Sequence, residues 1–264
     1  MDTTASDNPR NPKALQPDVP QTRNEFEDFI YLISHDVRSS VRALIELPQW
    51  IAEDLQSAGV KLEGSVAESI ELMNTHTGRL DRMLVDLLTF SRVGRMQELK
   101  EVEVDVMLTD ILEEMRIPQG FRVSTDLAAN TLYLGERDAL TMITQLISNT
   151  IKHHDTGTGE ISIQMAETDA GTVLRIIDDG PGILPQYRER AFSAMTTLRP
   201  RDEVEGSGMG LTIVRKIAHC YGGKVALSDV ANGRGTVVTV SFPDRSIVAE
   251  TMGACVRASN KKGH

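Results

Sequence analysis

One histidine in this sequence has neighbours suited to moving a phosphoryl group. His35 is followed by Asp36, and Arg38, Ser39 and Arg42 lie three, four and seven residues after it. On a helix these three side chains gather on the side of the imidazole. A neutral ring nitrogen can attack phosphorus, the carboxylate can take or orient the other ring proton, and the arginines can offset phosphate charge. A solvated histidine on a charged helix face has the same pattern, so both interpretations stay open on these residues alone.

A second pair of residues could hold a metal ion and phosphate. Asn149 and Lys152 are three residues apart in a segment with helical spacing, so they share a face. A carboxamide oxygen is a hard ligand suited to Mg²⁺, and a lysine beside it can hold phosphate. Polar residues on an ordinary surface helix are the alternative.

Two glycine-containing segments could surround the rest of a nucleotide. In the first, Asp178 stands before Gly180 and Gly182 and directly follows a strand-like run. A carboxylate at a strand end can accept a hydrogen bond from an exocyclic amine such as that of adenine, and the glycines allow a tight turn against a ring. The second segment precedes a helical run, where free N–H groups and the helix dipole favour an anion. Its glycines are Gly206, Gly208 and Gly210. Each segment alone is also compatible with an ordinary turn.

Long helices are needed to present the histidine. Apolar residues recur every three or four positions from residue 26 to 55 and again from 66 to 87, with Gly59 at the break. His35 lies about 200° around the helix from Ile33, so it should face away from the apolar seam. Pro48 lies on the first stripe and should kink that helix. Two narrow seams favour a homodimer in which two hairpins form a four-helix bundle, rather than a hairpin packed on its own chain.

An α/β domain is expected to carry the other residues. Helical runs fall at 106–115, 137–153 and 209–221, between strand-like runs at 121–125, 131–134, 161–165, 173–177, 224–227 and 236–242. Adjacent strand-like runs predict a mixed sheet with helices on one face. The fold class is therefore α+β, a helical hairpin followed by an α/β sandwich. We expect a disordered tail over 1–22, the hairpin over 23–97, the α/β domain over 98–244 and a C-terminal tail over 245–264, where no pattern is visible.

Composition excludes several classes of protein. The 264 residues carry a net charge of −10, which argues against a nucleic-acid partner. The two cysteines have no metal-ligand or disulfide spacing, which favours a reducing compartment. No signal-peptide segment or run of about 18 apolar residues occurs, so we expect a cytoplasmic protein without a membrane span.

The residues around the histidine resemble the H-box of histidine kinases. Residues 29–38 read FIYLISHDVR, an apolar run followed by Ser-His-Asp, an aliphatic residue and Arg. The resemblance implies that His35 is phosphorylated and that Asp36 is the general base. Ser39 stands where the family commonly has Thr or Asn, which positions water for phosphatase activity, and Ser40 replaces the usual Pro, so the family's helix bend is not expected there.

The order of the remaining motifs resembles the N, first glycine, F, second glycine and third glycine boxes of one ATP-binding domain. Histidine kinases share that domain with the gyrase, mismatch-repair and chaperone ATPases. The motifs are Asn149, then Asp178 with Gly180 and Gly182, Phe192, then Gly206 to Leu211, and Gly233 to Thr236. Together with the H-box, the resemblance covers residues 25–243.

By this resemblance ATP and Mg²⁺ are the cofactors. Asn149 binds Mg²⁺, Lys152 and His153 approach phosphate, and Asp178 reads adenine. Residues 196–205 would be a mobile lid, with Arg199 or Arg201 as candidate phosphate contacts.

Three functions fit these motifs: a histidine kinase, an ATP hydrolase of the gyrase or chaperone class, and a non-catalytic phosphotransfer scaffold. The hydrolases carry a water-activating Glu four residues before the magnesium Asn, where this chain has Gln145. A carboxamide is not a useful general base. Intact nucleotide motifs argue against the scaffold. We therefore predict autophosphorylation on His35 and transfer to an aspartate of a response-regulator receiver domain, with phosphatase activity left open. Little chain precedes the first helix, so the signal is expected from a separate sensory protein or from the short N-terminal tail, unless this is a piece of a longer chain.

Overall fold

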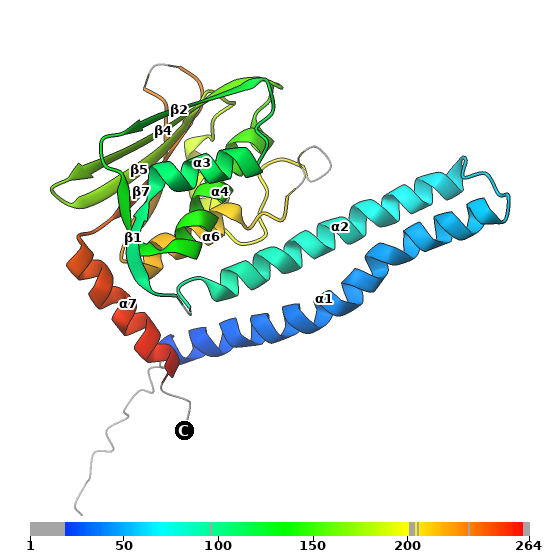
Figure 1. Cartoon of the computed structure of the whole chain (residues 1–264), viewed down its shortest axis with the longest axis horizontal. Coiled ribbons are helices and arrows are strands. Elements are labelled where there is room, and N and C mark those ends of the chain that lie inside the picture. The colour runs from blue at the N-terminus through cyan, green and yellow to red at the C-terminus, as the bar shows by residue number, and fades with distance from the viewer. Residues whose placement is uncertain (1–18, 96, 201–203, 205, 232, 261–264) are drawn as a thin grey trace, which may run out of the picture.

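The structure is a computed structural model that describes residues 19–95, 97–200, 204, 206–231 and 233–260. A long helical hairpin lies beside an α/β lobe, and the lobe follows the second helix of the hairpin (Figure 1). The hairpin consists of α1 (Val19–Ser57) and α2 (Ser65–Arg92). Because α1 begins at Val19, the last four residues of the expected N-terminal tail are helical, and the rest of that tail lies outside the described residues. No helix among the described residues is long and apolar enough to cross a membrane.

The first helix runs unbroken through its proline. Pro48 lies inside α1, which changes direction along its length without interruption (Figure 1). A proline removes one helical hydrogen bond and crowds the carbonyl four residues earlier, which bends a helix without ending it when packing holds both halves. The hairpin packing is provided by α2, and Ser34, Val41 and Pro48, each seven residues apart, are buried on α1.

Part of the predicted apolar stripe is exposed on this single chain. Ile33, Val37, Leu44 and Ile51 of α1 are all exposed. They lie beside the buried positions of α1, because residues three apart are separated by only about 60° around a helix. Val66, Met73 and Leu80 are exposed in the same way on α2. One hairpin therefore buries only one edge of its apolar seam.

The main sheet of the lobe is mixed, as predicted. Its strand order is β2 (Phe121–Leu127), β4 (Gly159–Thr168), β5 (Gly171–Asp178), β7 (Thr236–Phe242) and β6 (Lys224–Asp229). The pair β2–β4 is parallel and the other pairs are antiparallel. A separate antiparallel pair joins β3 (Thr131–Gly135) to β1 (Leu99–Glu103), a strand that the sequence pattern did not reveal.

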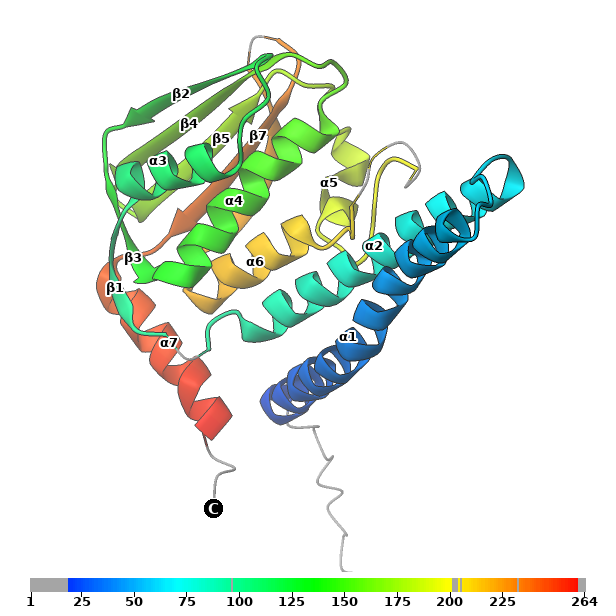
Figure 2. The ribbon, with the colours of Figure 1, turned by 45° about the vertical axis from the view of Figure 1, so that its right-hand side comes forward.

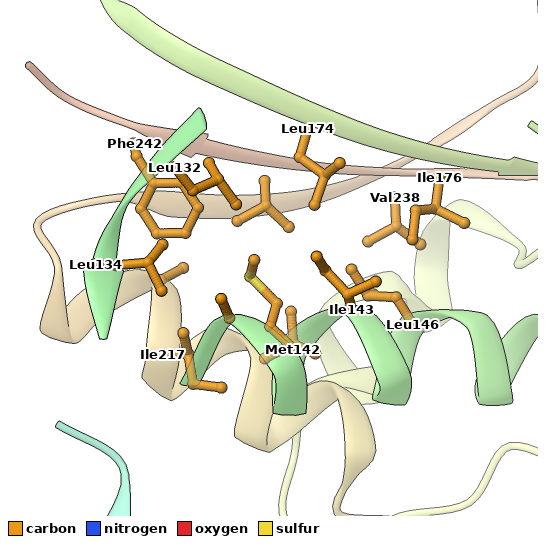
Figure 3. Close-up of a cluster of buried hydrophobic side chains, with 14 of the residues drawn as sticks. Leu132, Leu134, Met142, Ile143, Leu146, Leu174, Ile176, Ile217, Val238 and Phe242 are labelled. Carbon is orange, nitrogen blue, oxygen red and sulfur yellow. The ribbon is translucent and has the colours of Figure 1, made fainter. Parts of the chain in front are cut away.

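Three helices cover one face of this sheet. They are α3 (Val104–Glu114), α4 (Glu136–His153) and α6 (Gly210–Cys220), as Figure 2 shows. The core lies between the sheet and α4 and α6, where Met142, Ile143 and Ile217 meet Leu174 and Val238 (Figure 3). The short α5 (Pro185–Ala191) follows β5 and starts with a proline, which suits the first turn of a helix.

The expected C-terminal tail is instead helical. Helix α7 (Arg245–Asn260) extends from β7 toward the N-terminal end of α1 (Figure 1), and it contacts α1, α6 and β3. Val248 and Met252 are four residues apart and both buried in the core of the lobe. Two apolar positions are too few to produce a readable periodicity, so only tertiary contact shows the role of this segment.

Candidate nucleotide and histidine site

A cavity of about 690 Å³ opens between α4, the start of α6 and the segment after β5. Its volume falls in the range of pockets that hold ligands of nucleotide size. Eleven of the residues predicted to bind the nucleotide line it: Asn149, Lys152, His153, Asp178, Gly182, Arg199, Gly206, Gly208, Gly210, Leu211 and Thr236. Gly180 is not in the lining, but its N–H donates to the carboxylate of Asp178 (2.9 Å). Arg201 lies outside the described residues.

The carboxylate of Asp178 lines the cavity at the end of β5. Its Oδ1 accepts hydrogen bonds from the backbone N–H groups of Gly180 (2.9 Å) and Thr236 (3.1 Å), which fixes its direction at the end of β5. Burial raises the pKa of Asp178, and these two hydrogen bonds oppose that rise. Both donors use the same oxygen, so Oδ2 remains for a ligand that enters the cavity.

The third glycine segment packs directly on the backbone of Asp178. Gly235 has φ +125°, and a Cβ there would lie 1.8 Å from the Asp178 carbonyl oxygen, so only glycine fits. Arg234 donates from Nε to the Gly180 carbonyl (2.9 Å) and pairs with Asp155 (2.5 Å). These contacts hold the segments after β5 and before β7 together around the carboxylate.

Basic groups and the start of α6 also line the cavity. Desolvation of the ring at the cavity wall, followed by the charges of Arg199 and Lys152, lowers the pKa of His153, although much of that residue's surface stays exposed. Gly208 has φ +73° and packs against the backbone of Thr196. The cavity therefore combines Lys152 and Arg199 with the N-terminus of α6, groups suited to phosphate.

The residues present fit one magnesium ion held jointly with phosphates. Asn149 lines the cavity close to Gly210, where a Cβ would come within 3.1 Å of the Asn149 Oδ1. The described residues include no group of three or more His, Cys, Asp and Glu side chains that could hold a metal alone. Since Mg²⁺ is commonly bound through few protein oxygens plus substrate phosphates, Asn149 would be its protein ligand here.

His35 lies on α1, outside this cavity, and faces solvent. Its side chain is 68% exposed, as the helical rotation predicted. Its Nδ1 lies 3.2 Å from Asp36 Oδ1. Because an ionised carboxylate only accepts, this contact assigns the ring proton to Nδ1 and leaves the lone pair on Nε2.

The polar residues expected around His35 are arranged differently. Arg38 turns to α2, where its Nε lies 3.4 Å from Asp81, so it does not gather at the imidazole. The Ser39 hydroxyl donates to the Asp36 backbone carbonyl (2.8 Å). Tyr31 instead provides the ring beside His35, with centroids 6.3 Å apart and planes 28° from parallel.

Two groups of cavity residues were missed by sequence reasoning. Arg82, Val85 and Asp86 of α2 line the cavity, because the lobe docks on that helix. His154 also lines it, and its buried ring contacts Asp179 Oδ1 (3.0 Å) beside Asp178. The docking of α2 leaves no local sequence signal, whereas His154 directly follows the predicted His153 and could have been considered with it.

Comparisons with known proteins agree with this geometry. Residues 135–246 match the family described as histidine kinase-, DNA gyrase B- and HSP90-like ATPase. The methanogenesis regulatory histidine kinase FilI of Methanothrix harundinacea is 29% identical over 228 residues, which cover 83% of this chain and 25% of FilI. The signal transduction histidine-protein kinase AfsQ2 of Streptomyces coelicolor is 28% identical, over 81% of this chain and 41% of AfsQ2. The chain thus spans less than half the length of either relative.

Solved structures share the arrangement of hairpin and lobe. Full-length ShkA in complex with AMPPNP aligns with a TM-score of 0.62 at 20% identity, over 82% of this chain and 45% of ShkA. Histidine kinase ThkA, solved in complex with the response regulator protein TrrA, aligns with a TM-score of 0.57 at 20% identity, over 84% of this chain and 64% of ThkA. At this identity the structures show the fold alone. The sequence matches show that residues 135–246 are similar to the ATPase domain of histidine kinases, and that most of the chain is similar to parts of FilI and AfsQ2.

Proposed function

We propose that this chain is an ATP-dependent protein-histidine kinase that phosphorylates His35 and passes the phosphoryl group to an aspartate of a response-regulator receiver domain. The observation that carries the proposal is a solvent-facing imidazole, in contact with Asp36, in one chain with a cavity lined by Asp178, Asn149 and Lys152.

The chemistry at His35 follows from its hydrogen bond. Bound ATP supplies the γ-phosphoryl group. The Nε2 lone pair forms the new N–P bond while the bond from the γ-phosphorus to the bridging oxygen breaks, and ADP leaves with that electron pair. Asp36 holds the Nδ1 proton throughout and stabilises the positive charge that develops on the ring. If the chain also acts as a phosphatase, the Ser39 hydroxyl is the group proposed to orient water. In this structure that hydroxyl donates to the backbone carbonyl of Asp36.

Several residues of the cavity have a proposed role in holding the nucleotide. Asp178 Oδ2 accepts from the exocyclic amine of adenine, while Lys152 and Arg199 offset phosphate charge and Asn149 binds Mg²⁺. The amide of Gln145 lines the cavity where a hydrolase would need a carboxylate, which favours transfer to histidine over transfer to water.

The proposed partners are a second copy of the chain and a response regulator. The exposed seam residues of α1 and α2 would pack against the same residues of a second copy, so that the two hairpins form a four-helix bundle. A response regulator is proposed because ThkA was solved in complex with one, and His35 here is accessible to such a protein.

Labelling with γ-phosphate-labelled ATP tests the kinase assignment. We expect wild-type protein to gain acid-labile, alkali-stable label, and the His35→Gln variant to gain none. A His76→Gln variant is the matched control, because His76 lies on α2. Equal labelling of wild type and His35→Gln would refute the assignment.

Removal of the proposed metal ligand tests the nucleotide site separately. The Asn149→Ala variant should lose labelling because the metal loses its protein oxygen. Persistent Mg²⁺-dependent labelling of this variant would show that the magnesium site is wrong even if His35 is the acceptor.

A further inference from the structure

Helix α2 contributes a carboxylate to the nucleotide cavity. Asp86 lines the cavity together with Lys152 and Gly208, although it belongs to the hairpin and they belong to the lobe. The Ser207 hydroxyl donates a hydrogen bond to Asp86 Oδ2, and the same Ser207 oxygen accepts from the Met209 backbone N–H (3.0 Å). Ser207 is buried and lies between the glycines at the start of α6. Asp86 therefore contacts the segment best suited to receive phosphate groups.

The negative charge of Asp86 opposes the binding of phosphate groups at this segment. Burial raises the pKa of Asp86, and the Ser207 hydrogen bond and the charge of Lys152 only partly compensate. A phosphate chain at the start of α6 would place further negative charge beside this carboxylate and would compete with it for Lys152 and Ser207.

Further contacts keep the lobe against α2. Lys216 of α6 is only 5% exposed, and its Nζ donates to the Phe90 carbonyl (2.6 Å). The Arg137 guanidinium donates to the Arg92 carbonyl (3.1 Å), and the Gly94 N–H donates to Asp138 (2.8 Å). The Asp86 contact is thus one part of a docked arrangement that extends from the cavity to the end of α2.

His35 is absent from the cavity in this docked arrangement. The Arg38–Asp81 ion pair and the Arg92–Tyr31 contact place His35 on α1 between the levels of Asp81 and Arg92, the stretch that contains Asp86. The cavity nevertheless borders α2 at that level and does not include the imidazole.

We propose that Asp86 is an autoinhibitory gate, which holds the phosphate-binding segment against α2 and weakens the binding of nucleotide phosphates until the lobe moves off the helix. The inference rests on the proposed nucleotide site. It does not require that His35 be the phosphate acceptor.

Binding of AMPPNP and of adenosine to the full chain tests the gate. Asp86→Asn removes the charge but keeps an oxygen that can accept from Ser207. We expect it to lower the Kd for Mg-AMPPNP by about three- to tenfold and to leave the Kd for adenosine unchanged, because only the phosphates meet the carboxylate. Asp110→Asn is the control, because Asp110 is exposed on α3 and this substitution changes the net charge by the same amount. The control variant should alter neither Kd.

The outcomes separate the gate from the kinase assignment. An unchanged or weaker affinity of Asp86→Asn for Mg-AMPPNP, in protein whose unfolding temperature shows it is folded, overturns the gate. An equal gain for adenosine also overturns it, because the effect would then not act through the phosphates. If the affinities behave as expected but no variant labels on histidine, the gate stands and the kinase proposal fails. Asp86→Ala, which removes the hydrogen bond as well, should reproduce the gain for AMPPNP.

Discussion

If Asp178 binds the nucleotide as proposed, its raised pKa should make nucleotide affinity depend on pH. The carboxylate accepts best when ionised, so affinity should be full above its raised pKa and fall as the pH drops through it, at a higher pH than for an ordinary aspartate. We expect the Kd for AMPPNP, measured by calorimetry from neutral to acidic pH, to rise over that interval. Asp178→Asn should weaken binding at pH 7 by about 10- to 100-fold, the loss of a charge-assisted hydrogen bond.

Acidification should change folding stability through Asp178 in the opposite direction to nucleotide affinity. A carboxyl whose folded pKa is raised above its unfolded value costs stability when ionised in both states, and that cost disappears as the pH falls through the folded pKa. Stability of wild type relative to Asp178→Asn should therefore increase on acidification while nucleotide affinity decreases. If affinity and relative stability fall together, loss of folding rather than protonation of Asp178 explains the pH dependence.

Local sequence rules placed the nucleotide residues well but not the residues supplied by docking. Asp178, Asn149 and Lys152 were predicted together because the order of their motifs resembles that of one ATP-binding domain, and the structure brings all three to one cavity. The exposure of His35 also followed from helical rotation. Arg38 was misplaced, because its tertiary partner Asp81 could not be read from α1, and Asp86 was missed for the same reason.

At the scale of elements, the docking of α6 on α2 depends on a buried lysine. Lys216 donates to the Phe90 carbonyl and its Nζ lies 4.2 Å from the Phe90 ring centroid. Lys216→Ala should lower the free energy of unfolding by about 1.5–3 kcal/mol, because it removes a charged hydrogen bond and leaves the carbonyl poorly satisfied. Urea unfolding measures this loss. The exposed Lys224 provides the control, and Lys224→Ala should change stability by less than about 0.5 kcal/mol; an equal loss for both would show that Lys216 has no special role.

Elements with a clear apolar pattern were predictable, and those with few buried positions were not. The helices α4 and α6 matched their expected ranges to within one residue at each end, because each has a full apolar face on the sheet. The strand β1 is five residues long and has one buried position, Val102, so its alternation carries little information. Helix α7 is held through Val248 and Met252, which pack in the core of the lobe. Their contacts are tertiary, so the sequence of α7 alone does not reveal them.

For the whole molecule, the exposed seam predicts a homodimer. Leu44 lies on α1 with Ile33, Val37 and Ile51 on the exposed apolar side, and a charge there would have to be buried between two hairpins. Leu44→Arg should raise the dimer dissociation constant by at least about tenfold, equivalent to about 1.4 kcal/mol. Ala43→Arg adds the same charge about 100° around the helix, on the side away from that seam, and should leave the dimer intact.

Light scattering across a dilution series distinguishes these variants, and labelling links assembly to function. A wild-type chain that is monomeric at every concentration would mean that the exposed seam serves some other contact. If wild type and Ala43→Arg dimerise and Leu44→Arg does not, AMPPNP affinity should still be equal in all three, because the seam residues do not line the cavity. Equal affinity with dimerisation lost would show that the lobe binds nucleotide independently of the bundle, so that any loss of His35 labelling in Leu44→Arg arises from assembly rather than from the nucleotide site.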